Sequence, residues 1–155
     1  MPHDVDYSSS MPYMWADTLQ AAERAHLLRL LLWAAASILA GTALLAWLRA
    51  GGHRSDLLRH FAIQAAAWGT VIALISAWQL PHLTPRDIAG ATRLDRLLWF
   101  EVGLDAGTVV VGITIGAVGL RLGQQMKLIG AGMGVIVQGC ALALLNLVLA
   151  AQISR

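Results

Sequence analysis

The chain has 155 residues, of which 57% are apolar and only 13% are charged, and its formal net charge is +2. This balance excludes disorder over most of the chain, and the single cysteine excludes a disulfide scaffold. A water-soluble globule is disfavoured, because so few polar side chains would not cover its core. The length instead suits about four membrane crossings of roughly 20 residues each.

The chain starts with a polar stretch, residues 1–16, that contains two acids, three consecutive serines and two prolines. Its charges are acidic, and the apolar run behind it is too long for a secretory signal, so we exclude a signal peptide. We predict a flexible polar tail over residues 1–16 and a transmembrane domain over residues 17–155.

Four apolar runs follow the tail, at residues 27–48, 61–80, 97–120 and 128–151. Each run has 20 to 24 residues, enough for an α-helix to cross a hydrocarbon core of about 30 Å. Two of the three connections are short, so consecutive helices are expected to be antiparallel. The predicted fold is therefore all-α: a polytopic membrane protein built as an antiparallel four-transmembrane-helix bundle, with both termini on one side.

Residues in the connections are typical of helix ends. Ser55 is a predicted N-cap for the second helix, and the glycine pair that starts at Gly51 ends the first helix. The segment 84–87 combines a threonine, a proline and an aspartate, which predicts a short interfacial helix that ends at Gly90. Thr92 then repeats the capping pattern and is the predicted start of the third long helix.

The basic residues do not decide the orientation of the chain in the membrane. Of the 11 lysines and arginines, similar numbers fall on each side of the predicted membrane, so the positive-inside rule favours neither orientation. The sequence contains no basic stripe that alternates with aromatic residues, and nucleic acid is therefore not an expected partner.

Glycine is concentrated in the third and fourth apolar runs, where small residues let membrane helices approach closely. Because glycine weakens a soluble helix by roughly 1 kcal/mol, its abundance predicts that the third and fourth helices pack backbone to backbone. The alternative is an interface of the same kind between two copies of the chain. The predicted packing positions are Gly103, Gly107, Gly112, Gly116, Gly130, Gly134 and Gly139.

A cluster of four polar residues is predicted inside the membrane, near the side of the termini. Glu101 and Asp105 lie one helical turn apart, and a carboxylate at that depth costs about 2.5–3.5 kcal/mol unless it has a partner or a proton. Arg29 on the first helix and Asn146 on the fourth have similar predicted depths. The cluster is either a proton or cation site or a buried ion pair that fixes helix order. In a third interpretation, both acids reach the water at the headgroups.

A second polar stripe, at four-residue spacing, consists of His60, Gln64 and Trp68 on the second helix. With Gln138 on the fourth helix, these residues form either a candidate ligand site or a set of interhelical hydrogen bonds, each contributing about 0.6–2 kcal/mol. The histidines lie at different depths, which disfavours haem, and no zinc-ligand spacing is present. We expect no cofactor and no metal.

Three motifs carry a resemblance over roughly residues 57–153. They are His60-x3-Gln64-x3-Trp68-Gly69, then Gly103-Leu104-Asp105-x-Gly107, then Gly130-x-Gly132 followed by Gln138-Gly139 and the polar Asn146. In these motifs the chain resembles a family of uncharacterised bacterial four-helix integral membrane proteins, a domain of unknown function. The family pattern has asparagine where Glu101 stands and aspartate where Asn146 stands, which implies that a charge has moved between neighbouring helices. The resemblance implies a class of protein and no activity.

These observations predict a multi-pass protein of the bacterial inner membrane that is not an enzyme. The leading hypothesis is an accessory or scaffold subunit of a membrane assembly, because the glycine faces suit packing and no catalytic motif is present. Its expected partners are the lipid bilayer and either other membrane subunits or further copies of itself. The alternative is a small proton-coupled transporter or channel that uses Glu101 and Asp105. A membrane enzyme acting on lipid or quinone is the weakest alternative.

Overall fold

The computed structural model describes the backbone of residues 7–153 and the side chains of residues 16–153. This part of the chain is all-α, as predicted. Each of its four α-helices contains a stretch long and apolar enough to cross a membrane. The elements are α1 (Tyr7–Ala50), α2 (Asp56–Gln79), the 3₁₀ helix η1 (Leu80–His82), α3 (Ile88–Arg121) and α4 (Met126–Ile153).

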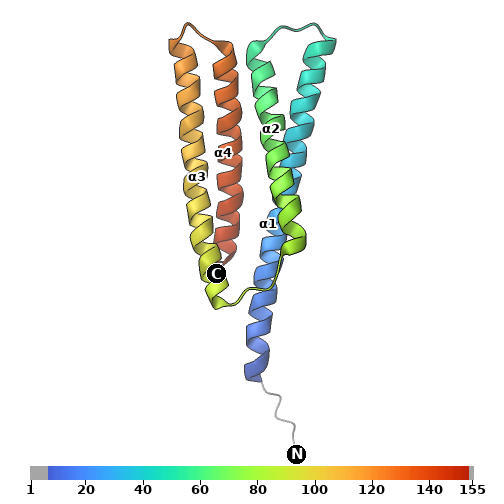
Figure 1. The fold of residues 1–155 in the computed structure, drawn as a ribbon, viewed down its shortest axis with the longest axis vertical. Coiled ribbons are helices and arrows are strands. Elements are labelled where there is room, and N and C mark those ends of the chain that lie inside the picture. The colour runs from blue at the N-terminus through green and yellow to red at the C-terminus, as the bar shows by residue number, and fades with distance from the viewer. Residues whose placement is uncertain (1–6, 154–155) are drawn as a thin grey trace, which may run out of the picture.

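The α-helices alternate in direction and form two hairpins, α1 with α2 and α3 with α4 (Figure 1). We call the end where α4 finishes the terminal side, and the end with the two hairpin loops the hairpin side. Helix α4 lies in the middle and packs against α3, α2 and, less extensively, α1. Helix α3 makes no comparable contact with α2 or α1. Helix α3 is therefore held mainly by α4, and the bundle is open between α3 and α2.

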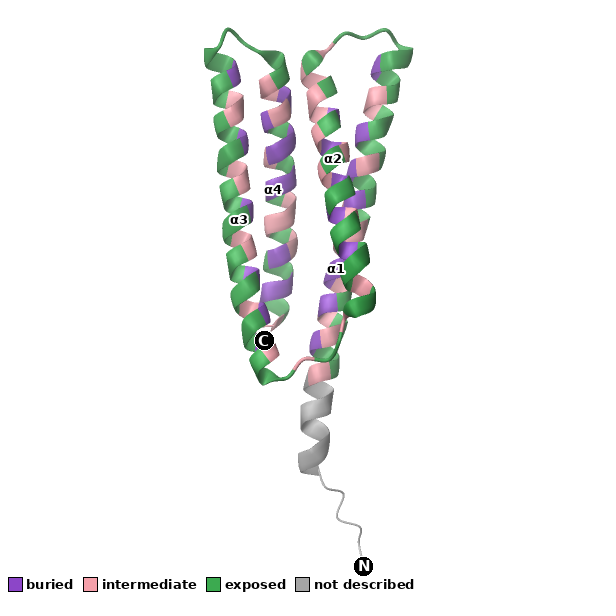
Figure 2. Cartoon of the chain, viewed as in Figure 1, coloured by how far each residue is buried: buried purple, intermediate pink, exposed green. Residues whose placement is uncertain are grey.

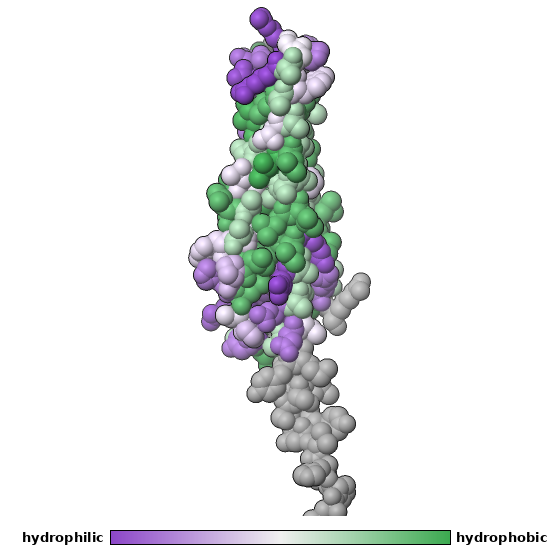
Figure 3. All heavy atoms as spheres, turned by 90° about the vertical axis from the view of Figure 1, so that its right-hand side faces the viewer, coloured by the Kyte–Doolittle hydropathy of each residue, from purple (hydrophilic) through white to green (hydrophobic). Residues whose placement is uncertain are grey.

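All four α-helices have exposed residues along their length (Figure 2), and many of these residues are large and apolar. Leu32 on α1, Leu74 on α2, Phe100 on α3 and Leu144 on α4 are 72%, 67%, 63% and 65% exposed. In the space-filling view, apolar atoms occupy the middle of the described surface and polar atoms gather toward its two ends (Figure 3). An apolar belt between polar ends is the surface that a bilayer solvates, so the fold suggests a membrane protein.

The first connection ends one helix and begins the next as the sequence predicts. Helix α1 stops at Ala50, and Gly52 takes a positive φ of 62°, which glycine adopts without steric cost. The Ser55 side chain accepts a hydrogen bond from the backbone N–H of Leu58 at 3.3 Å. Ser55 is therefore the N-cap of α2, and this prediction is confirmed.

The prediction of a short helix at residues 84–90 is wrong. Helix α3 begins at Ile88, and its N-cap is Asp87, whose Oδ1 accepts a hydrogen bond from Gly90 N at 2.7 Å. Thr92 lies inside this helix and donates its hydroxyl to the carbonyl of Ile88 at 3.0 Å. The aspartate makes the capping bond that we had assigned to the threonines, so one long helix replaces the two predicted.

Helix α1 starts earlier than predicted. It begins at Tyr7, so the boundary of the polar tail at residue 16 lies too far along the chain; residues 1–6 of that tail are outside the described range. Just after that boundary, Leu19 is buried in an apolar cluster with Leu98 of α3 and Leu149 of α4.

Glycines on α4 allow close approach of helices on two sides. A Cβ on Gly132 would lie 2.6 Å from the carbonyl oxygen of Gly112 on α3, a distance that real Cβ atoms do not tolerate. Toward α2, a Cβ on Gly134 would lie 2.7 Å from the Cβ of Gln64, and one on Gly130 would collide with the carbonyl of Leu57. Close packing of α3 on α4 is thus present, and glycines of α4 allow α2 to pack on α4 in the same way.

Two of the predicted packing glycines, Gly103 and Gly107, do not contribute to these contacts, whereas Gly116 contributes through its backbone: its N would lie 2.7 Å from a Cβ on Gly132. A Cβ on Gly103, Gly107 or Gly116 would meet no atom within 4 Å. The α4-facing stripe of α3 runs through Asp105 and Gly112, which are buried seven residues apart. Gly103 and Gly107 are each two residues from Asp105, and two steps of about 100° turn a side chain to the opposite face. The spacing of the glycines in the sequence therefore does not identify the face of α3 that contacts α4.

We expect Gly132→Ala to destabilise the protein by about 1–3 kcal/mol, because its methyl group has no room between the two backbones. Gly107→Ala is the matched control: its methyl group points into open space, and alanine favours the helix. Thermal unfolding in detergent, followed by circular dichroism, measures the difference. Equal unfolding temperatures for the two variants would show that the α3–α4 approach is not tight.

Candidate functional site

A crevice lies between α2 and α3 in the half of the molecule nearer the terminal side. Two cavities form it, one of about 400 Å³ near the terminal end and one of about 190 Å³ deeper in the helices. Both cavities are lined by Leu30, Ile75, Ser76 and Glu101. Ile75 is 52% exposed and α2 has no extensive contact with α3. The crevice therefore has a lateral opening at the apolar surface.

An ion pair holds the terminal end of the crevice together. The guanidinium of Arg86, in the connection before α3, donates from Nε to Glu23 Oε1 at 2.7 Å and from Nη2 to Glu23 Oε2 at 3.0 Å. Such two-point pairing fixes geometry as well as charge. Nearby, Gln20 donates to the carbonyl of Leu83 at 3.3 Å. Helix α1 thereby anchors the connection that forms this end of the crevice.

Asp105 and Asn146 meet across the α3–α4 interface. The Asn146 Nδ2 donates to Asp105 Oδ2 at 2.8 Å, and both side chains are buried. Glu101 lies one turn closer to the terminal side, is partly buried and faces both cavities. Its carboxylate has neither a hydrogen bond nor an ion pair with any residue that the structure describes. One carboxylate is thus held by an amide while the other faces the crevice unpaired.

The predicted partnership of Arg29 with these acids is not formed. Among the described residues the ion pair is that of Arg86 with Glu23, and the buried Nη1 of Arg29 has no hydrogen-bond partner there. Helix α1 packs on α2 and α4, whereas α3 lies beyond α4. Equal depth along the membrane normal therefore did not bring the residues together, because their helices are not neighbours at this level.

His26 belongs to the crevice and was not predicted there. It is 6% exposed, lines the larger cavity, and its Nδ1 is buried without a hydrogen-bond partner in residues 16–153. Glu23 precedes it by three residues and is also buried. The helical spacing of Glu23, His26 and Leu30 is the signal that could identify it, but the predicted first span begins only at residue 27.

The second predicted set of polar residues divides between two places. Gln138 is 2% exposed; it accepts from the Trp33 indole N–H at 2.8 Å and donates to the Ser37 hydroxyl at 3.2 Å. It therefore links α4 to α1, through two residues that the sequence analysis missed. Trp68 lines the deeper cavity of the crevice instead.

The other two members of the stripe, His60 and Gln64, make contacts outside the crevice. The His60 Nδ1 is 2.9 Å from the carbonyl oxygen of Asp56 on the same helix, and the Cβ of Gln64 packs against Gly134. No hydrogen bond joins Gln64 to Gln138 in the described part of the chain. The structure thus brings Trp68 to the crevice and places no common ligand site among the four residues.

The chemistry available in the crevice is that of an acid facing an apolar space. An unpaired carboxylate at this depth is costly in its ionised form, so it favours a proton or a bound cation. Within residues 16–153, no group of three or more histidine, cysteine, aspartate or glutamate side chains is placed to hold a metal ion. The crevice therefore presents the Glu101 carboxylate, the Asp105–Asn146 pair in its deeper part and apolar walls to a ligand.

We expect Asn146→Asp to destabilise the protein by about 1–3 kcal/mol, because it replaces the donor to Asp105 by a second carboxylate. Adding Glu101→Asn removes one acid from the cluster and places an amide near it, so the double variant should recover much of the loss. A double-mutant cycle of unfolding free energies in detergent measures this coupling. Additive effects would contradict an energetic link between these positions.

Comparison with known proteins gives a family and no activity. A family of unknown function, DUF6992, matches residues 29–147, a range that includes parts of all four α-helices and begins before residue 57, where the resemblance was predicted to start. No curated protein and no solved structure matches the chain. The chain therefore belongs to the family of unknown function DUF6992.

Proposed function

We propose that this protein is a non-enzymatic, multi-pass protein of the bacterial inner membrane that binds a cationic amphiphile in the crevice between α2 and α3. Glu101 carries the proposal: it lines both cavities and has no ion-pair partner among the described residues. A cation with an apolar body suits this combination, because its charge neutralises the carboxylate while its body contacts the apolar walls.

The charge balance of the crevice supports a cationic ligand. Arg86 lines the larger cavity, but its charge is compensated by Glu23. The acids left without a cationic partner are Glu101 and Asp105, and the Asn146 amide solvates only the latter. A bound cation would offset the cost of about 2.5–3.5 kcal/mol for a carboxylate at this depth. Glu101 is therefore the expected counter-ion.

The walls support an apolar body for the ligand. Val71, Ile72 and Leu104 line the deeper cavity, and Leu97 lines the larger one. The larger cavity, at about 400 Å³, is within the range of small-molecule sites, about 300–1,000 Å³. Because the opening is lateral, we infer that an amphiphile enters from the surrounding lipid.

Proton-coupled transport is an extension of the same proposal. A carboxylate that holds either a proton or a cation couples the binding of one to the release of the other. Glu101 would have this role in a small transporter. Transport also needs access from the hairpin side, and midway along α4 the Gln138 side chain is bonded to Trp33 and Ser37 of α1. That contact would have to open during transport, whereas binding alone does not require it.

An accessory or scaffold role is the second candidate function, and the outer face of α3 favours it. Helix α3 packs extensively on α4 alone, and Gly103 and Gly107 have open space where a further helix could approach. Another membrane subunit or a second copy of the chain are the partners we propose for this role. It requires no ligand in the crevice.

Binding of tetraphenylphosphonium, a lipophilic cation, to the protein in phosphatidylcholine nanodiscs tests the proposal. We expect Glu101→Gln to weaken binding at least about tenfold, or roughly 1.4 kcal/mol, because the ligand loses its counter-ion. Asp95→Asn is the matched control, since it removes one acid from α3 outside both cavities. Binding that is absent, or insensitive to Glu101→Gln, would overturn the proposal and leave the accessory role.

A further inference from the structure

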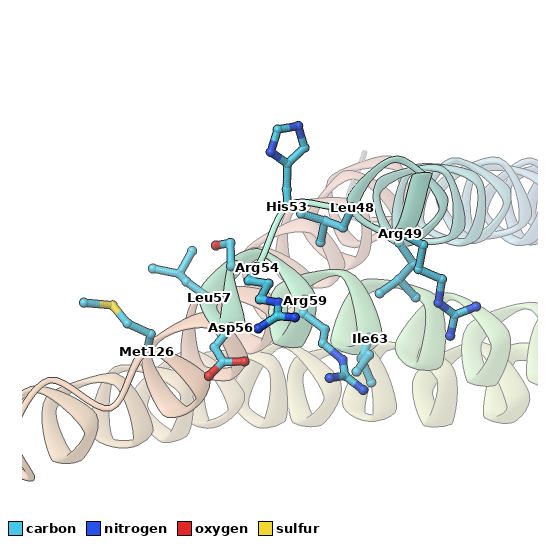
Figure 4. A pocket seen from close by; sticks show the side chains of 11 residues that line it. Leu48, Arg49, His53, Arg54, Asp56, Leu57, Arg59, Ile63 and Met126 are labelled. Atoms are coloured by element: carbon cyan, nitrogen blue, oxygen red, sulfur yellow. The ribbon is translucent and has the colours of Figure 1, made fainter. Parts of the chain in front are cut away.

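We propose a second ligand site, distinct from the crevice, that binds the anionic headgroup of a membrane phospholipid on the hairpin side. The site is a pocket of about 980 Å³ between the end of α1, the α1–α2 connection and the start of α2 (Figure 4). We call it the arginine pocket, because Arg49, Arg54 and Arg59 line it. It shares no lining residue with the two cavities of the crevice.

The arginine pocket carries an excess of positive charge. Asp56 is the acid among its lining residues, and none of the three arginines forms an ion pair within the described part of the chain. A guanidinium presents a planar set of N–H donors that matches two phosphate oxygens, and it keeps its charge at any physiological pH. Three unpaired guanidinium groups around one hollow therefore favour a phosphate-bearing ligand.

The positions of the three arginines are set by structured backbone. Arg49 is in the last turn of α1, and Arg59 is in the first turns of α2, which Ser55 caps. The connection between them is closed by a backbone hydrogen bond from His53 N to Leu48 O at 3.1 Å. The backbone that carries the arginines is therefore in place before any ligand arrives, which lowers the entropic cost of binding.

The histidine in the connection lines one edge of the pocket but does not point toward the arginines. Figure 4 shows the His53 side chain extending away from Arg49, Arg54 and Arg59. Its imidazole stacks on the indole of Trp47, with ring centroids 4.6 Å apart. Since tryptophan is typical of the membrane–water interface, this stack also places the connection, and with it the arginines, at headgroup level.

The remaining walls favour a lipid over a soluble phosphate. Leu45, Leu57, Ile63 and Met126 line the same pocket, and both Ile63 and Met126 are 43% exposed on the outer surface. Leu45 and Ile63 lie one helical turn deeper than Arg49 and Arg59, and apolar side chains below a cationic cluster match a molecule whose phosphate continues into acyl chains. Basic pockets between transmembrane helices recognise anionic headgroups by this combination.

Lipid titration of the purified protein, measured by native mass spectrometry in detergent, tests the arginine pocket. We expect phosphatidylglycerol to bind at least about tenfold more tightly than phosphatidylcholine, because only the former has a net negative headgroup. In Arg54→Gln/Arg59→Gln this preference should fall to about twofold or less, since most of the local charge is lost. Unfolding temperatures without added lipid should match the wild type.

Arg93→Gln/Arg96→Gln is the matched control, because it removes the same charge from the terminal side, outside the pocket. This variant should keep the preference for phosphatidylglycerol. Inorganic phosphate is the competitor that separates the two sources of the ligand, and it should not displace the lipid at comparable concentration. Absence of the preference, its equal loss in both double variants, or displacement by phosphate would each overturn the proposal.

Discussion

Helices α3 and α4 approach so closely at Gly112 and Gly132 that a Cβ on Gly132 would lie 2.6 Å from the Gly112 carbonyl oxygen. In lipid, apolar side chains gain little by leaving the solvent, so helices associate through such close packing and through polar contacts. This approach sets the rotation of α3 about its axis, which directs Asp105 toward Asn146 and leaves Glu101 one turn away, facing the crevice. The polar chemistry of the crevice depends on this glycine contact.

The central position of α4 explains why the crevice exists. Its glycines meet α3 on one side and α2 on the other, and its two buried amides are used in different directions. Asn146 donates to α3, whereas Gln138 is bonded to two side chains of α1. Because α4 occupies the middle, α2 and α3 are kept apart, and the gap between them near the terminal side is lined by all four helices. A closed bundle would have filled it.

The sequence predicts the features that depend on position along the chain, such as spans, caps and turns. It does not predict which helices are neighbours or which face of a helix contacts its neighbour. The four spans, the Ser55 cap and the glycine turn after α1 follow from local composition, and the structure has them. Arg29 was assigned to Asp105 from depth alone, but α1 is not a neighbour of α3 at that level. Gly103 was grouped with Gly112 although the two face opposite ways. A single sequence cannot reveal either error, because the packing of all four helices together determines which helices and which faces are in contact.

The resemblance that places asparagine at position 101 and aspartate at position 146 has a physical interpretation in this geometry. Asp105 accepts from Asn146 across the interface and has Glu101 one turn below on its own helix. Exchanging amide and acid between positions 101 and 146 keeps two carboxylates and one amide in the cluster, so the electrostatic cost of the group changes little. What changes is which residue is the unpaired acid: here it is Glu101 on α3, which lines both cavities, whereas Asp105 and Asn146 line the deeper one and are bonded to each other. A carboxylate that only fixed helix order would gain nothing from lining two cavities, so its placement favours a role in binding over a role in packing.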